Sequence, residues 1–263
     1  MKIGCCVSLF HDAVFTLSGL GVDYAEIGLS ELSLHSGEEI SERAERLSEA
    51  GVPCLAGNVL FPGELALTGP HTELSAISEY LGATLEKAAL LGVRTVVFGS
   101  GGSRRAPEGF PREAAWEQLR GLCAELLSPA LQKHGMTCCI EPLNRRECNI
   151  LNTSEECACL VREVGKPNIR LLVDLYHFDL EREPLSVLAG YGDILAHAHI
   201  ASAKNGRALP KEGDGEDYAA FFQALRSIGY SGSLSLEGSV SGTFEDCIAE
   251  SAAYVRKFSA LKA

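Results

Sequence analysis

Four apolar segments in the second half of the chain each finish near an ionisable residue: Glu141, Asp174, His199 and Glu237. Burying one such charge costs several kcal/mol unless the charge is paired or bound to an ion. Three carboxylates and one imidazole suit Mn²⁺, Mg²⁺ or Co²⁺ better than a thiolate zinc centre. The residue types therefore predict one divalent cation, with Mn²⁺ expected and Zn²⁺ also compatible. The alternative is a set of solvated side chains.

The four residues need a fold in which consecutive strand ends meet. We interpret as strands residues 3–8, 24–28, 52–60, 94–99, 137–143, 169–176, 194–200 and 232–237. Most are continuously apolar, as expected of strands covered on both faces. Amphipathic stretches between them predict helices at 36–50, 71–91, 111–134, from 153 onward, 218–228 and 244–261.

Eight strands alternating with helices favour one α/β domain over residues 1–263, with a parallel sheet. The length fits a (β/α)8 TIM barrel, which typically uses about 250 residues. A doubly wound sheet is the alternative fold. Reactive residues of a TIM barrel lie at the carboxyl ends of its strands, so a barrel would bring the four ionisable residues to one mouth.

The composition narrows the class of partner. The chain is 46% hydrophobic and 22% charged, as soluble globular proteins are. A net charge of −12 disfavours nucleic acid and anionic membranes, and no stretch approaches the roughly 20 apolar residues of a membrane helix. His11 and Asp12 follow the first apolar residues too soon for a secretory signal, so we expect a cytoplasmic protein.

The ten cysteines predict reduced thiols rather than a metal site. Two pairs, Cys5-Cys6 and Cys138-Cys139, are adjacent within expected strands. Neighbours in a strand point to opposite faces, so neither pair can chelate one ion. Small buried side chains are the expected role.

Three other features carry weaker signals. His197 shares a strand face with His199 but lies deeper, which fits a hydrogen-bonded core residue as well as a functional one. The glycine-rich segment 99–105 is typical of a rim loop or a phosphate contact. Residues 238–243 precede a helix at a position where barrels often bind phosphate.

The motifs together resemble the xylose isomerase-like TIM-barrel family of sugar isomerases and epimerases, and most closely its D-tagatose and D-psicose 3-epimerases. The resemblance is strongest between residues 95 and 240. It is carried by EPLNRRE at 141–147, DLYH at 174–177, HAH at 197–199, Arg207 and LSLE at 234–237.

The resemblance implies a metal-dependent keto-sugar epimerase or isomerase. Its metal ligands would be Glu141, Asp174, His199 and Glu237. Its substrate contacts would be Glu147, His177 and Arg207, although the segment between His199 and Arg207 is slightly longer here than in the 3-epimerases. A small-molecule sugar is the expected partner, and a homo-oligomer is compatible with the family.

The implied chemistry explains why two glutamates are needed. Removing the weakly acidic proton beside a carbonyl requires a cation that stabilises the resulting enediolate. Inverting that carbon also requires an acid and a base on opposite faces. Glu141 and Glu237 follow the fifth and eighth strands, so they are placed to flank a substrate and are the expected catalytic pair.

Other enzymes of the family remain as alternatives: a hydroxypyruvate isomerase-like isomerase or an inosose dehydratase-like lyase. A small acid substrate would need a cationic clamp, for which Lys204 and Arg207 are candidates. A nuclease of the endonuclease IV type needs more ligands than seven histidines readily supply. A non-catalytic sugar-binding relative should lack one of the paired glutamates, and both are present.

Overall fold

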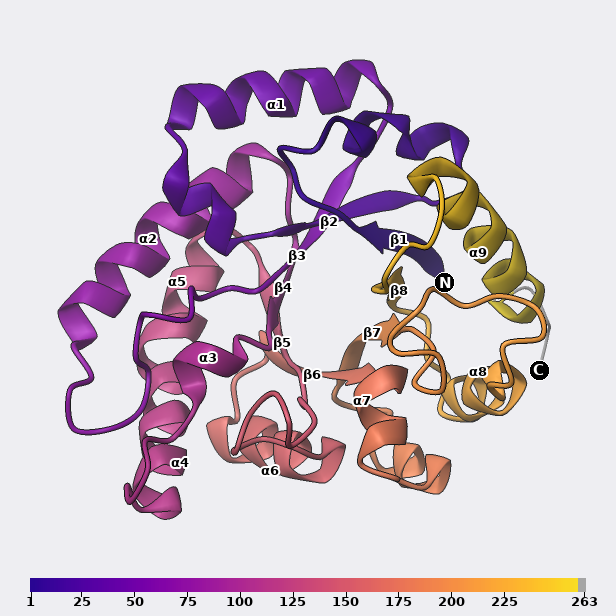
Figure 1. Cartoon of the computed structure of the whole chain (residues 1–263). Coiled ribbons are helices and arrows are strands. Elements are labelled where there is room, and N and C mark those ends of the chain that lie inside the picture. The colour runs from indigo at the N-terminus through magenta and orange to yellow at the C-terminus, as the bar shows by residue number, and fades with distance from the viewer. Residues whose placement is uncertain (260–263) are drawn as a thin grey trace.

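The computed structural model describes residues 1–259 and shows eight parallel strands closed into a barrel (Figure 1). The strands are β1 (Lys2–Cys6), β2 (Tyr24–Gly28), β3 (Cys54–Asn58), β4 (Thr95–Phe98), β5 (Thr137–Ile140), β6 (Ile169–Asp174), β7 (Leu195–Ile200) and β8 (Ser233–Leu236). Each strand pairs with the next, and β8 pairs with β1 from Lys2↔Ser233 to Cys5↔Leu236. The TIM barrel prediction is therefore confirmed, and the doubly wound sheet is excluded.

Helices surround the barrel on its outside (Figure 1). They are α1 (Gly37–Glu49), α2 (Leu74–Leu90), α3 (Gly101–Arg104), α4 (Arg112–Gly121), α5 (Ser128–Lys133), α6 (Ser154–Val164), α7 (Leu175–Leu180), α8 (Tyr218–Ser227) and α9 (Phe244–Ser259). Short 3-10 helices at Asp12–Gly19, Ser30–Leu34 and Leu185–Gly190 complete the connections. The predicted last helix extended to 261, and its last two residues lie outside the described residues. Across residues 1–259, no helix is both long and apolar enough to cross a bilayer.

The predicted long helix at 111–134 contains a change of winding. A π-helical turn, Leu122–Leu127, joins α4 to α5. Pro129 lies just beyond this turn and has no N–H to donate back along the helix. In a π turn the backbone hydrogen bonds join residues five apart instead of four, which accommodates the missing N–H. The helix therefore continues past the proline.

The barrel interior is layered beneath its mouth. Val97, Cys139 and Leu172 form a small apolar cluster on β4, β5 and β6. Cys139 and Leu172 precede Glu141 and Asp174 by two residues, so each pair shares a strand face. Cys138 instead packs in the larger core, which confirms that this cysteine pair points to opposite faces. All ten cysteines are free thiols.

The loop after β5 is held by its own polar side chains. The Asn152 side-chain amide donates to the carbonyls of Leu143 and Cys148 at 2.8 and 2.9 Å. The Thr153 hydroxyl accepts a hydrogen bond from the Glu156 backbone N–H and so caps the start of α6. The Glu156 carboxylate in turn accepts from the backbone N–H of Asn152 at 2.7 Å. The start of α6 thus closes the loop that begins at Glu141.

Arg104 is a buried clamp that the sequence analysis did not anticipate. The glycine-rich segment expected as a rim loop or phosphate contact forms α3, and its Arg104 is fully buried. The guanidinium donates to the carbonyls of Phe98 at 2.9 Å, Glu141 at 2.8 Å and Leu151 at 3.2 Å. One side chain therefore ties the end of β4 to the end of β5 and to the following loop.

Replacing Arg104 with Met should destabilise the protein, because three carbonyls would lose their buried donor. We expect the free energy of unfolding to fall by about 2–4 kcal/mol, measured by urea denaturation. Arg120→Met is the matched control, since Arg120 pairs with Glu117 on the exposed face of α4 and should change stability by less than about 0.5 kcal/mol. Equal losses of stability in the two variants would refute the proposed stabilising role of Arg104.

Candidate metal centre

The four ionisable residues singled out from the sequence meet at the carboxyl ends of β5 to β8. One ligand atom from each of Glu141, Asp174, His199 and Glu237 lies within 4.8 Å of the others. Asp174 and His199 are fully buried, Glu141 is nearly so, and the Glu237 side chain is 20% exposed. The fold thus brings the whole predicted ligand set together, and its role as ligands stays a prediction.

The contacts within this group suit a cation. His199 Nδ1 lies 3.1 Å from Glu141 Oε1 and 3.0 Å from Glu237 Oε2. Asp174 Oδ2 is buried and has no hydrogen-bond partner among residues 1–259. Leaving a buried acceptor unsatisfied is unfavourable, and a divalent ion would satisfy it. One imidazole nitrogen and three carboxylates therefore fit an ion such as Mn²⁺.

Burial and like charges set the protonation of the group. Burial, reinforced by Glu237, raises the pKa of Asp174 to about 8, although Arg207 opposes the shift. Burial also raises the pKa of Glu141. At Glu237 burial is outweighed by His199 and Arg207, which hold the pKa at about 2. A cation entering this group competes with a proton on Asp174 in particular.

His177 presents a hydrogen-bond donor to the site. Its Nδ1 accepts from the Asn144 backbone N–H at 3.2 Å, and the Asn144 side-chain amide lies 2.8 Å away. Burial, with Arg207, lowers the pKa of His177 to about 3, so the ring is neutral. A neutral ring that accepts at Nδ1 carries its hydrogen on Nε2. That buried Nε2 has no hydrogen-bond partner in the described part of the chain.

Arg207 and Glu147 line the same space. The Arg207 guanidinium lies 2.7 Å from Glu237 Oε2, 3.8 Å from Glu147 Oε2 and over the Tyr176 ring. Arg207 has φ of 67°, an uncommon conformation for a residue with a long side chain. Such strained positions occur preferentially at functional sites. The longer segment before Arg207 therefore does not remove it from the site, whereas Lys204 turns away toward Glu216.

Two glycines leave room for the Glu141 carboxylate and for the loop that carries Arg207. A Cβ at Gly99 would lie 2.2 Å from Glu141 Oε2. A Cβ at Gly238 would lie 2.9 Å from the Arg207 carbonyl oxygen, where the loop carrying Arg207 passes beside β8. The Ser239 N–H donates to that same carbonyl at 2.7 Å. The absence of side chains at these positions is therefore part of the site's geometry.

Of the loops that follow the first three strands, one reaches this mouth. Asn58, which ends β3, donates to Glu237 Oε1 at 3.4 Å. His11 accepts from the Ala13 N–H and so caps the 3-10 helix Asp12–Gly19. Of these two residues, Asn58 is the one that contacts the four-residue group.

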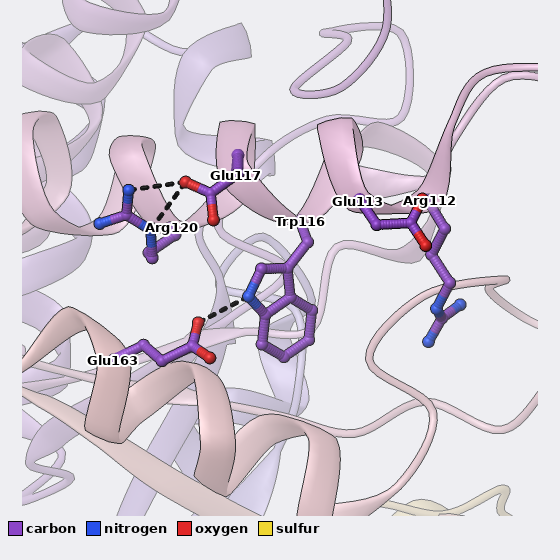
Figure 2. Close-up of a pocket in the computed structure, with 6 residues that line it drawn as sticks. All are labelled: Arg112, Glu113, Trp116, Glu117, Arg120 and Glu163. Atoms are coloured by element: carbon purple, nitrogen blue, oxygen red, sulfur yellow. Dashed lines mark hydrogen bonds and ion pairs between the residues drawn. The ribbon is translucent and has the colours of Figure 1, made fainter.

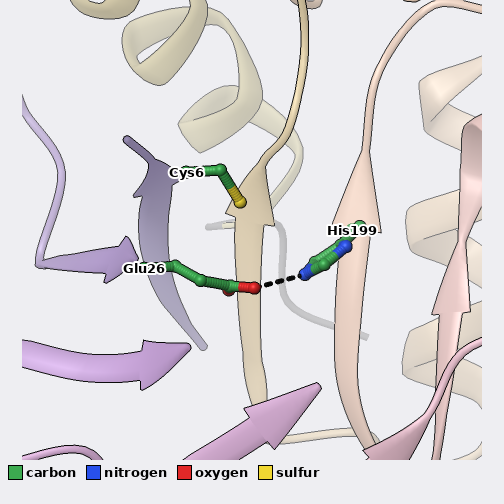
Figure 3. Close-up of side chains that lie close together, drawn as sticks. All are labelled: Cys6, Glu26 and His199. Carbon is green, nitrogen blue, oxygen red and sulfur yellow. Dashed lines mark hydrogen bonds and ion pairs between the residues drawn. The ribbon is translucent and has the colours of Figure 1, made fainter. Parts of the chain in front are cut away.

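Glu26 was missed by the sequence analysis. It lies inside β2, is fully buried, and is 2.8 Å from His199 (Figure 3). His197 lies 2.8 Å from its other carboxylate oxygen. Burial would raise the pKa of Glu26, but the two imidazoles hold it well below its usual value. His197 is therefore a hydrogen-bonded core residue. A lone acidic residue within a continuously apolar strand was the available signal, because such a charge must be paired.

A second hollow lies on the outer ring of helices, between α4 and α6 (Figure 2). Trp116 Nε1 donates to Glu163 Oε2 at 2.6 Å across it. Arg120 in its wall is paired with Glu117 on the same helix. None of its lining residues comes from a strand end, so the barrel mouth is the better candidate site.

The comparisons with known proteins agree with the fold. Residues 16–258 match the xylose isomerase-like TIM barrel family. The chain is 26% identical over 236 residues to D-psicose 3-epimerase of Agrobacterium fabrum, spanning 87% of this chain and 78% of that protein. It is 29% identical over 168 residues to 3-dehydro-D-guloside 4-epimerase of Escherichia coli, spanning 64% and 61%.

A solved structure of D-psicose 3-epimerase in the presence of D-fructose superposes with a TM-score of 0.78. It covers 99% of this chain and 97% of its own, at 21% identity. Identity this low establishes a shared fold and no more.

Mn²⁺ binding should depend on pH, because Asp174 keeps a proton below its raised pKa of about 8 and the ion must displace it. Calorimetric affinity is expected to rise from about pH 6 to about pH 8, by up to about tenfold per pH unit for the Asp174 proton. Asp193→Asn, an exposed aspartate, should leave the profile unchanged. An affinity that stays constant over this range would contradict the assignment.

Proposed function

The chain belongs to the xylose isomerase-like TIM barrel family, and we propose that it is a divalent-metal-dependent epimerase or isomerase of keto-sugars. The observation that carries the proposal is the buried group of Glu141, Asp174 and His199 with Glu237, in which one carboxylate oxygen lacks a partner among the described residues. The names of the relatives, which are sugar epimerases, support the same class of reaction.

The proposed reaction moves a proton at the carbon beside the substrate carbonyl. A cation held by the four residues would stabilise negative charge on the substrate oxygens. Glu141 and Glu237 both approach His199 Nδ1, from β5 and β8. We propose that these two carboxylates, which come from different strands, act on opposite faces of one carbon. One removes the proton and the other delivers a proton to the other face, which inverts that centre.

Three side chains are proposed to position the sugar. His177 offers its Nε2–H, Glu147 offers carboxylate acceptors, and Arg207 offers guanidinium donors. All three surround the same space above Asp174, from which His177 Nε2 is 3.4 Å away. Hydroxyl groups both donate and accept, so this mixture suits a polyol better than an apolar ligand.

The second candidate is an aldose–ketose isomerase or a lyase acting on a small acid or inosose. The observation that favours a small acid is Arg207, whose guanidinium faces the group of carboxylates. Lys204 does not complete the clamp, because it is engaged by Glu216 and the Gly215 carbonyl. Assaying keto-sugars, hydroxypyruvate and inosose side by side with Mn²⁺ distinguishes the candidates by product.

Glu141→Gln and Glu237→Gln should each slow turnover by at least about 10²-fold at saturating Mn²⁺, because an amide cannot exchange the proton. In D₂O the wild-type product should carry deuterium at the inverted carbon. Glu117→Gln, on the exposed face of α4, should retain full activity. Product formed without solvent deuterium would contradict the two-glutamate mechanism and favour a hydride shift.

Asp174→Ala and His177→Ala should separate metal binding from substrate binding. Elemental analysis is expected to show lost metal in Asp174→Ala, because the Asp174 Oδ1 accepts from the Tyr176 N–H whereas Oδ2 has no hydrogen-bond partner among residues 1–259 and is free to bind the ion. His177→Ala should keep its metal and lose turnover. Metal loss in both variants would make His177 a structural support of the centre instead.

A further inference from the structure

Glu26 lies beneath the candidate metal centre and uses both of its carboxylate oxygens. Oε1 lies 2.8 Å from His199 Nε2. Oε2 lies 2.8 Å from His197 Nε2 and accepts from the Ser235 hydroxyl at 2.6 Å. Glu26, His197 and His199 are all fully buried. Since every one of these bonds lies inside the barrel, water does not compete for them.

The carboxylate is also held from below. His197 Nδ1 lies 2.8 Å from the Ser233 hydroxyl, and the Ser235 hydroxyl lies 2.7 Å from the Tyr24 hydroxyl. The Tyr24 ring in turn packs on Gly4, where a Cβ would come within 2.2 Å of it. Rotation of the Glu26 carboxylate would break bonds to two other strands, so its orientation is fixed.

This arrangement decides which nitrogen of His199 keeps its hydrogen when a cation binds. An ionised carboxylate only accepts hydrogen bonds, so His199 Nε2 must be the donor to Glu26. A cation that displaces the proton from Nδ1 leaves a neutral imidazole with hydrogen on Nε2, and this ring offers the cation the lone pair of Nδ1. Nδ1 is the nitrogen that lies 3.0 to 3.1 Å from the carboxylates of Glu237 and Glu141.

We propose that Glu26 is a positioning residue that fixes the tautomer and orientation of His199, so that Nδ1 faces the cation. The proposal rests on the metal site of the proposed function. Carboxylates that receive the second N–H of a ligating imidazole raise its basicity and hold its plane. Glu26 does this from the opposite side of the ring to Glu141 and Glu237.

Cys6 is the third member of this neighbourhood (Figure 3), and a separate thiolate site there is the competing interpretation. Its sulfur, a Glu26 oxygen and a His199 nitrogen lie within 4.8 Å of one another. Glu26 Oε1 and His199 Nε2, however, are bonded to each other at 2.8 Å. An ion between them would have to separate these atoms, so we assign the pair to a hydrogen bond.

The wild-type protein tests the proposal directly. Nitrogen-15 NMR of histidine-labelled protein loaded with diamagnetic Zn²⁺ reports which nitrogen is protonated, with His199 assigned from the His199→Asn spectrum. We expect a protonated Nε2 and a metal-bound Nδ1. A protonated Nδ1, or Zn²⁺ on Nε2, would overturn the proposal whether or not any Glu26 variant folds.

Glu26→Gln supplies the second measurement. A glutamine amide can donate to Nε2 and so favour the wrong tautomer, and we expect Mn²⁺ affinity measured by calorimetry to fall by about 10- to 100-fold. Glu163→Gln makes the same change on the outer helix α6, where Glu163 pairs with Trp116, and should change affinity by less than about threefold. Unchanged affinity in Glu26→Gln would refute the inference. Because neither measurement contains substrate, a protein that passes both but converts no keto-sugar would refute the proposed function alone.

Discussion

The concentration of negative charge in a buried barrel mouth is the constraint on which the rest of the site depends. Glu141, Asp174 and Glu237 share one space with His199 between them, and Glu26 lies beneath. Charges removed from water are tolerated only when opposite charges or hydrogen-bond donors surround them. The two core imidazoles and the Arg207 guanidinium supply that compensation within the described residues, and a divalent cation would complete it.

The scaffold meets this constraint mainly through its backbone. The Arg104 guanidinium donates its hydrogen bonds to backbone carbonyl oxygens and not to the carboxylates. It therefore makes the strand ends more rigid and does not pair with the acidic group. Gly99 and Gly238 have no side chain, which leaves space for the Glu141 carboxylate and for the loop that carries Arg207. The polar centre therefore rests on strand ends whose positions are set by packing and by main-chain hydrogen bonds, which favours a preorganised geometry.

The sequence predicted the alternating strands and helices and the ionisable residues at four strand ends. Alternating apolar and amphipathic segments indicated the barrel, and an ionisable residue near each of four strand ends indicated the group around Asp174. The roles of Glu147, His177 and Arg207 came from resemblance alone. The role of Glu26 was not predicted, because Glu26 lies within its strand and its partner His197 is 171 positions away in the sequence. The buried position of Arg104 was not predicted, because the glycines beside it are typical of an exposed loop. Tertiary contacts bury it.

The Glu26 network also bears on the order in which the chain assembles. It joins β2 to β7 and β8 through residues separated by 171 and 209 positions. Contacts so distant in sequence form after local ones, because the intervening loop must first be closed. Until the last strands dock, the Glu26 carboxylate keeps its water shell and holds the first strands open to solvent. An N-terminal half-barrel that lacks β7 and β8 would therefore leave the Glu26 carboxylate without these hydrogen-bond partners.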